Sequence, residues 1–356
     1  MLSANDDMRQ GQAEDQAAAL SYDLVAPLDW FQLRCLLWEA LPEALAAPAA
    51  PNWMSVATAV NGGCPASSPI SARQCEALAG RLTAALPEGQ SLLSDASSGP
   101  RAWNHLLYGI VHDRLGSPVF MNLGYADPGL GGLELLPDDE PNRLFIQLYE
   151  RTVGTVSLRG RDVLEVGCGA GGGAMYLWRY HEPRTLQGID LVEANIAASR
   201  RLARDAGPTF SRGVAEKIDR PDASVDVLIN IESSFTYAFA QFLQECHRVL
   251  RPGGHVLIAD HRPVDEEWGR GRSIREFRDL LHGSRLRVLR DEDITGGVVA
   301  ASLALAELKQ QILPAAALSA QDEMHFREIL HCSGSRNHER LVSHRWQYRC
   351  VTLHKE

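Results

Sequence analysis

Hydrophobic and polar positions follow two different periods in the second half of the chain. Short apolar runs of strand length recur near residues 162–166, 185–189, 208–211, 225–230, 255–260, 285–290 and 346–353. Apolar positions at helical spacing predict helices near 172–180, 192–205, 238–250 and 273–282, with more in 297–332. Strands that alternate with helices pair in parallel through right-handed crossovers. The pattern therefore predicts an α/β fold with a Rossmann-like, doubly wound, seven-stranded and mostly parallel sheet.

The first hundred residues follow another pattern. Residues 1–20 are polar, whereas apolar residues between 30 and 41 recur at helical spacing. The stretch 44–69 is rich in Ala, Pro, Gly and Ser and carries a turn signal at 61–63. Ser71 is placed to cap a further helix. We therefore expect a disordered tail at 1–20, a helical N-terminal region at 21–100 and an α/β domain at 101–356.

The role of the N-terminal region stays open between two alternatives. It is either a packing or dimerisation element, which would make the protein a homodimer, or a lid or wall over a substrate. The segment 104–125, which has a helical pattern up to Leu115 followed by Gly116-Ser117-Pro118, and a second helical pattern at 139–149 lie directly before the first strand. These two segments can therefore cover a ligand bound at the end of that strand.

The chain is organised around a glycine-rich turn at 167–173, which follows the apolar strand 163–166. Glycine lets the backbone turn tightly and lets a ligand lie against main-chain amides. Residues 174–178 begin a helix whose N-terminal amides point at that ligand. Strand, turn and helix together form the nucleotide-binding corner of a doubly wound domain. Glu165 at the strand end favours a cationic ligand, and Asp190 after the second apolar run can accept from ribose hydroxyls.

Composition and charge narrow the classes of partner. Of 356 residues, 45% are hydrophobic and 22% charged, which is ordinary for a globular protein with a sizeable core. The formal net charge of −10 argues against nucleic acid and against an anionic membrane surface. No apolar run reaches membrane-spanning length. The seven cysteines do not have zinc spacing, and with the polar start they indicate reduced thiols in the cytoplasm and no metal site.

The glycine turn alone fits two kinds of nucleotide enzyme. Gly167, Gly169 and Gly172 match the G-x-G-x-x-G pattern of dinucleotide binding, so a nicotinamide enzyme is the main alternative. The second kind of enzyme is favoured by Glu165 and by the downstream Leu250–Gly254 stretch, which reads L-R-P-G-G before a strand. With them the chain resembles the class I S-adenosylmethionine-dependent methyltransferases.

From about residue 106 onward the chain is similar to a narrower group within that family. The group comprises mycobacterial phthiotriol and phenolphthiotriol methyltransferases and related fatty-acid and glycopeptidolipid O-methyltransferases. The matching segments are Asn122–Tyr125, Asp139–Arg143, Leu164–Ala174, Gly188–Leu191, Asn230–Ser234, Leu250–Gly254, Ala259–Asp260 and Gln347–Arg349. The resemblance implies methyl transfer from S-adenosylmethionine to a hydroxyl of a large lipid or secondary metabolite.

Residue roles follow from the resemblance and from the chemistry of the cofactor. Backbone at Gly167, Gly169 and Gly171 would approach the methionine part, and Glu165 would offset its ammonium group. Asp190 would accept from the ribose hydroxyls and Leu191 would pack beside the adenine. Asn230 and Ile231 would border the sulfonium. The family has an Asp that meets the adenine amino group, but this segment reads Gly213–Glu216, so adenine recognition would rest on Val214, Ala215 or Glu216.

The family also places a His after the Glu-Ser-Ser run, where this chain has Phe235. A general base, if the acceptor hydroxyl needs one, must then lie at another carboxyl strand end. Glu232 after the fourth strand and His261 after the fifth are the candidates. Each has a plainer alternative, as an ion-pair, capping or structural residue.

We therefore predict a cytoplasmic S-adenosylmethionine-dependent methyltransferase that acts on oxygen of an apolar polyketide, lipid or similar natural product. Because the family's His is missing, one alternative is an enzyme of the same fold that catalyses a non-methylating step such as cyclisation. The other is a non-catalytic partner subunit that interacts through residues 21–100. The mass of the product distinguishes methylation from a non-methylating reaction, because only methylation adds a CH₂ unit. Assaying turnover after deletion of residues 21–100 tests the partner-subunit alternative.

Overall fold

The structure is a computed structural model that describes residues 51–63, 69–85, 118–204, 207–264, 273–315 and 320–356 and parts of 104–116. The chain divides into two compact units, Met1–Gly116 with Leu318–Asp322 and Ser117–Ala317 with Glu323–Glu356. The predicted tail at 1–20 and the predicted helix at 30–41 lie outside the described residues. The proposed boundary near residue 100 and the role of residues 21–100 stay predictions.

In the first unit, α4 (Trp53–Gly63) and α5 (Ala72–Ala85) pack on each other, and the described residues between 104 and 115 are helical as well. The turn predicted at 61–63 is wrong, because these residues end α4. Packing of buried Val56 and Val60 outweighs the local turn preference. The Asn61 amide instead bonds both backbone groups of Ile70, at 2.8 and 2.9 Å. The predicted cap of α5 is confirmed, since Ser71 accepts from the backbone of Gln74.

The second unit holds a seven-stranded sheet with the strand order β3-β2-β1-β4-β5-β7-β6. Strands β1 to β5 pair in parallel, and β7 runs antiparallel to both of its neighbours. This confirms the predicted fold class. The strands are β1 (Asp162–Val166), β2 (Thr185–Asp190), β3 (Thr209–Arg212), β4 (Val225–Ile231), β5 (Leu250–Pro263), β6 (Arg287–Asp293) and β7 (Trp346–His354).

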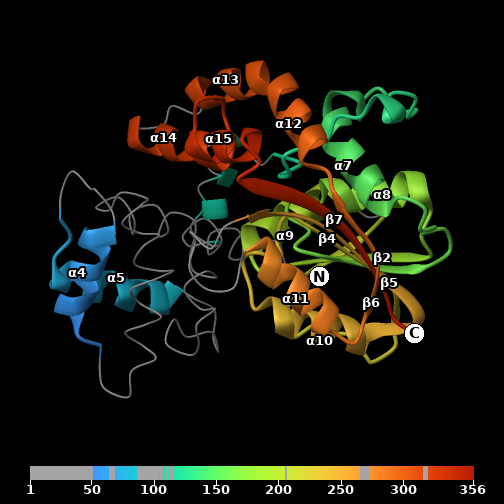
Figure 1. Cartoon of the computed structure of the whole chain (residues 1–356), viewed down its shortest axis with the longest axis horizontal. Coiled ribbons are helices and arrows are strands. Elements are labelled where there is room, and N and C mark those ends of the chain that lie inside the picture. Colours follow the sequence, from blue (N-terminus) through green and yellow to red (C-terminus); the bar gives the residue numbers. More distant parts are fainter. Residues whose placement is uncertain are drawn as a thin grey trace, which may run out of the picture. The chain divides into compact units, whose positions relative to one another are not determined.

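Helices cover both faces of this sheet, as the continuous apolar strands require. One face packs on α7 (Arg143–Val153), α8 (Gly172–His181) and α9 (Glu193–Ala203). The opposite face packs on α10 (Phe239–Val249) and α11 (Ile274–Gly283) (Figure 1). Two short helical turns, η2 (Pro128–Leu130) and η3 (Glu140–Asn142), precede α7. The nucleotide-binding corner therefore stands on a core that is closed on both sides.

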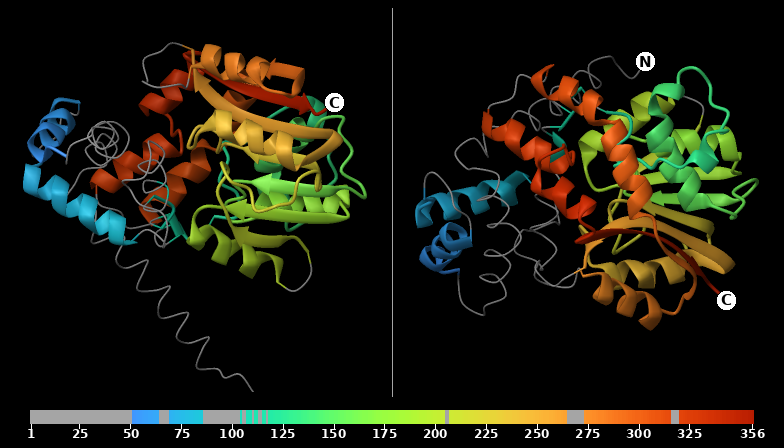
Figure 2. Two further views of the ribbon diagram at one scale, coloured as in Figure 1. Left: turned by 90° about the horizontal axis from the view of Figure 1, so that it is seen from below. Right: turned by 45° about the horizontal axis from the view of Figure 1, so that its top comes forward.

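Four helices are inserted between β6 and β7 and gather at one end of the sheet (Figure 2). They are α12 (Thr295–Ala304), α13 (Ala306–Ala315), α14 (Ala320–Ile329) and α15 (Arg336–Val342). The first residue of β7, Trp346, pairs with Pro263 at the carboxyl end of β5. The inserted helices therefore lie at the carboxyl ends of the parallel strands, where ligands bind in this class of fold. We call α12–α15 the C-terminal cap.

None of the helices in the described part of the chain combines the length and the apolar content that crossing a bilayer requires.

Candidate active site

The glycine turn joins β1 to α8 with three residues in the left-handed region. Gly167, Gly169 and Gly171 have φ values of +75°, +53° and +86°. A Cβ at Gly167 would overlap Ser233 beyond the end of β4, and a Cβ at Gly171 would lie 2.7 Å from the Cβ of Ser199. These positions therefore require glycine both for backbone conformation and for space.

Asp190 lies beside this turn at the end of β2. Its carboxylate accepts from the backbone N–H of Gly169 at 2.9 Å and of Val192 at 2.8 Å. The Asn195 amide donates to it at 3.1 Å. Asp190, which the sequence predicts to bind the ribose, therefore lies beside the glycine turn. Its hydrogen bonds hold the carboxylate in one orientation.

Glu165 is 1% exposed, beneath the glycine turn. Tyr149 of α7 donates to its Oε1 at 2.8 Å, while Oε2 is buried without a hydrogen-bond partner. Burial raises the pKa of Glu165 to about 8. A cation that met Oε2 would satisfy this atom and favour the carboxylate. The predicted role of Glu165 opposite an ammonium group fits this geometry.

The segment predicted to meet the adenine adjoins the same corner. The N–H of Gly213 donates to the backbone carbonyl of Asp190 at 2.9 Å, so the segment follows directly from the ribose position. Ala215 is buried, and Glu216 accepts from the N–H of Ala238 at 3.2 Å. Val214 forms an isolated bridge with Lys217. Leu191, which follows Asp190, accepts from Arg212 through its carbonyl.

Asn230 and Ile231 close β4 next to the end of β1. The Asn230 amide donates to the carbonyl of Val166 at 2.7 Å and to Tyr237 at 2.8 Å, but its Oδ1 is buried without a partner. Ile231 is 6% exposed and belongs to the core. The two strand ends are therefore joined at the point where the strand order reverses, which is where a ligand crevice opens.

Residues 118–125 lie against the glycine turn, as expected for a segment that covers the cofactor. The N–H of Gly172 donates to the carbonyl of Val119 at 3.1 Å. A Cβ at Gly169 would lie 3.3 Å from Sδ of Met121. The N–H of Leu123 donates to Glu232 at 2.8 Å and ties the segment to β4.

Glu232 has a left-handed backbone, with φ of +52°. In addition to Leu123, it accepts from the hydroxyl of Tyr348 at 2.7 Å. Burial raises its pKa to about 8, so near pH 7 most of this carboxyl is protonated. Through these hydrogen bonds Glu232 connects the end of β4 to β7 and to residues 118–125.

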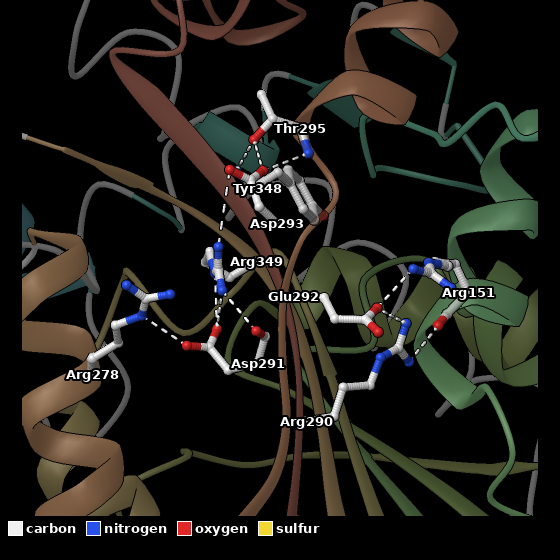
Figure 3. A network of polar contacts seen from close by, with 9 residues as sticks. All are labelled: Arg151, Arg278, Arg290, Asp291, Glu292, Asp293, Thr295, Tyr348 and Arg349. Atoms are coloured by element: carbon white, nitrogen blue, oxygen red, sulfur yellow. Dashed lines mark hydrogen bonds and ion pairs between the residues drawn. The ribbon is translucent and has the colours of Figure 1, made fainter.

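A polar network along β6 and β7 surrounds the backbone of Tyr348 (Figure 3). Its backbone N–H donates to the hydroxyl of Thr295 at 2.8 Å. Along the same pair of strands, Arg349 bonds Asp291 at 2.6 Å and Arg290 bonds Glu292 at 2.7 Å. The network fixes the antiparallel β6–β7 pair, from which the C-terminal cap departs.

His261 lies at the carboxyl end of β5, packed in a group of rings. Its ring stacks on Trp346 at 4.8 Å between centroids and lies 5.0 Å from Phe235. Its Nδ1 is 3.5 Å from Asp260 Oδ1, and the side chain retains 12% exposure. Burial lowers the pKa of His261 to about 4, so the imidazole is neutral at pH 7. Phe235, which stands where the family has its His, therefore contacts a different His.

Several contributors to this site were missed in the sequence. Tyr149 was noted as an apolar helix position and Tyr348 only within the matching segment Gln347–Arg349, and only the fold shows that each donates to a buried carboxyl. Ser234 was noted only within a motif, yet it donates to Asp260 at 2.6 Å. His255 pairs with His354 towards the opposite end of β5 and lies away from the site.

Comparison with known proteins agrees with this geometry. Residues 164–258 match the family model described as a methyltransferase domain. The chain is 40% identical over 210 residues to phthiotriol/phenolphthiotriol dimycocerosates methyltransferase 1 of Mycobacterium ulcerans, covering 58% of this chain and 74% of that protein. It is 45% identical over 155 residues to fatty-acid O-methyltransferase of Mycolicibacterium smegmatis, covering 43% of this chain and 57% of that one.

Solved structures of similar fold include the [4+2]-cyclase SpnF, with TM-score 0.54 and 19% identity over 71% of this chain and 95% of that one. A putative sarcosine dimethylglycine methyltransferase from Galdieria sulphuraria has TM-score 0.53 and 16% identity, over 72% and 98%. At these identities the likeness concerns the fold alone. Together with the relatives above, it shows that the chain belongs to the class I S-adenosylmethionine-dependent methyltransferases and uses S-adenosylmethionine as its cofactor.

Proposed function

We propose that the protein methylates an oxygen atom of an apolar natural product such as a polyketide or a lipid. The observation that carries the proposal is the neutral, partly exposed His261 beside Asp260 at the carboxyl end of β5. Two groups of relatives, named for phthiotriol and for fatty-acid O-methyl transfer, support an apolar oxygen acceptor. The rings of Phe235, Trp346 and Tyr348 around His261 fit an apolar acceptor as well.

The residues of the corner fit the cofactor. When bound, S-adenosylmethionine supplies an electrophilic methyl group on sulfur. The left-handed turn at Gly167, Gly169 and Gly171 would present main-chain groups to the methionine part, and the orphaned Oε2 of Glu165 would receive its ammonium group. Asp190 would accept from the ribose hydroxyls, and the Gly213–Glu216 segment would border the adenine.

His261 would act as the base for the acceptor hydroxyl. As the acceptor oxygen forms its bond to the methyl carbon and the carbon–sulfur bond breaks, the hydroxyl proton would pass to Nε2 of His261. With a proton on Nδ1, the nearby Asp260 would stabilise the imidazolium that results. Asp260 is 1% exposed and held by Ser234 and Arg262. Glu232, mostly protonated near pH 7, would position the acceptor end of the site without taking the proton.

The test is methyl transfer from labelled cofactor to hydroxylated lipids and polyketides, followed by mass spectrometry of the product. We expect one added CH₂ unit, and a loss of about 10²–10⁴-fold in kcat for His261→Asn. His255→Asn is the matched control, because this residue lies on the same strand at its opposite end. The control should keep its rate, and both variants should bind S-adenosylhomocysteine as the wild type does.

Two results would count against the proposal. A product of unchanged mass would favour the cyclisation alternative. Equal turnover of His261→Asn and wild type would remove the assigned base.

A further inference from the structure

The C-terminal cap contains a buried polar cluster that the proposed chemistry does not use. Its members are 2–8% exposed: Ser302 on α12, Lys309 on α13, His331 after α14 and His338 on α15. Nζ of Lys309 donates to the hydroxyl of Ser302 at 3.2 Å. That hydroxyl in turn donates to the carbonyl oxygen of His331 at 3.3 Å and lies 3.5 Å from Nδ1 of His338. Three of the cap's helices thus direct polar groups toward one point.

Within the described part of the chain, this cluster contains no carboxylate of its own. Among the described residues, no carboxylate lies within ion-pair distance of Lys309, whose single hydrogen bond goes to Ser302. Nδ1 of His331 is buried without a hydrogen-bond partner. Buried lysines are rare unless they are paired, and buried polar atoms are nearly always bonded. An unpaired lysine and an unpaired imidazole nitrogen in one cluster therefore indicate that a partner is supplied from outside.

The cluster borders the place where the acceptor must react. The ring of His331 lies 5.7 Å from the ring of His261 and 5.9 Å from that of Trp346. Burial lowers the pKa of Lys309, while Cys332 and, when it is ionised, Glu232 act in the opposite direction and favour the charged lysine. Because burial holds the pKa of Glu232 near 8, this carboxyl is mostly neutral at pH 7 and does not repel an anion.

We propose that Lys309, Ser302 and His331 bind a carboxylate of the methyl acceptor. The inference rests on the proposed function, since it places the carboxylate on the same molecule that meets His261. Lys309 offers one positive charge and two N–H donors besides the one that Ser302 accepts, and the Ser302 hydroxyl would turn from the carbonyl of His331 to the carboxylate. A phosphate dianion would call for more positive charge or for an arginine fork, and the cluster contains neither. The acceptor is thus an acid whose carboxylate lies close to the reacting oxygen.

The test compares binding of matched acids and alcohols to the protein saturated with S-adenosylhomocysteine. The probes are dodecanoate with dodecanol, and benzoate with benzyl alcohol, measured by calorimetry. We expect wild type to bind at least one acid about tenfold or more tightly than its alcohol. Lys309→Met should lose this preference, and Ser302→Ala should lose part of it. Arg285→Met removes an exposed cation away from the cap and should leave the preference unchanged.

A second measurement guards against a variant that misfolds. Because Lys309→Met removes an unpaired buried cation, its Tm without ligand should equal or exceed that of wild type. A lower Tm would show that the lysine is satisfied within the fold, and would overturn the proposal. Equal affinity of wild type for every acid and its matched alcohol would also overturn it.

The binding assay separates this inference from the proposed function. Loss of acid preference concerns only the cluster, whereas an absence of methylated product from any acceptor concerns the reaction. Arg285→Met should keep both the acid preference and the methylation of hydroxylated acceptors.

Discussion

The affinity for the cofactor should depend on pH through a single buried carboxyl, Glu165. Without a ligand, burial holds its pKa at about 8, against 4.5 for the exposed group. If the ammonium group of the cofactor meets Oε2, the bound complex needs the carboxylate. Below pH 8 binding must therefore expel a proton from Glu165, and affinity falls as pH is lowered.

The magnitude follows from proton linkage. Each pH unit below the pKa of the free protein costs about 1.36 kcal/mol, or about tenfold in Kd. From pH 8 down to pH 6 the affinity for S-adenosylhomocysteine should fall by about 50-fold, because half of the carboxyls are still ionised at pH 8. Well above pH 8 it should decline again, because the ammonium group of the cofactor then loses its proton. His261, with its pKa of about 4, does not titrate in this window.

Isothermal titration calorimetry in buffers of different ionisation enthalpy measures both the affinity and the protons released. Near pH 6.5 we expect the release of close to one proton per cofactor. Glu165→Gln should bind weakly with a flat pH profile, whereas Glu182→Gln, which changes an exposed glutamate, should keep the wild-type slope. Tyr149→Phe removes a hydrogen bond that lowers the pKa of Glu165, so its profile should shift to higher pH.

The reasoning is refuted if wild-type affinity changes by less than about threefold between pH 6 and pH 8, or if Glu165→Gln keeps the slope. Either result would mean that the protonation state of Glu165 is not coupled to the cofactor.

Two further predictions concern packing around the same site. A Cβ at Gly173 would overlap the ring of Tyr149, so Gly173→Ala should destabilise the fold by about 1–3 kcal/mol in urea denaturation and weaken cofactor binding. Gly283→Ala, at a helical glycine with open space, is the control, and its destabilisation by as much would contradict the assignment. Tyr348→Phe removes the hydrogen bond to Glu232 and should cost about 0.5–1.5 kcal/mol, measured by the same denaturation; an unchanged midpoint would show that this bond contributes nothing.

The parts of the fold that depend on local pattern were predictable. Apolar runs placed all seven strands, with β5 longer than expected because Leu250 already pairs with Val225. The glycine turn and Asp190 were also predictable, since backbone conformation and strand-end position define them. The turn forecast at 61–63 failed because tertiary packing of α4 decided the outcome.

The acceptor end of the site was much harder to predict. His261 was a candidate only because it follows a strand, and its contacts with Phe235 and Trp346 join three distant segments. The cluster around Lys309 has no local signal at all, since Ser302, His331 and His338 come from separate elements of an insertion. Contacts of this kind depend on how helices cross, which residue periodicity does not specify.

The C-terminal cap leaves and re-enters the sheet at neighbouring positions. The N–H of Ile294 donates to the carbonyl of Tyr348 at 2.8 Å, and Asp293 pairs with Arg349. The chain therefore leaves the sheet after β6 and returns to it in β7 at two hydrogen-bonded positions, with the helices of the cap between them. Such an element can be exchanged for its counterpart from a relative without cutting the hydrogen bonds between strands. Chimeras joined at these two points would keep the cofactor half constant while changing the molecules that the enzyme accepts.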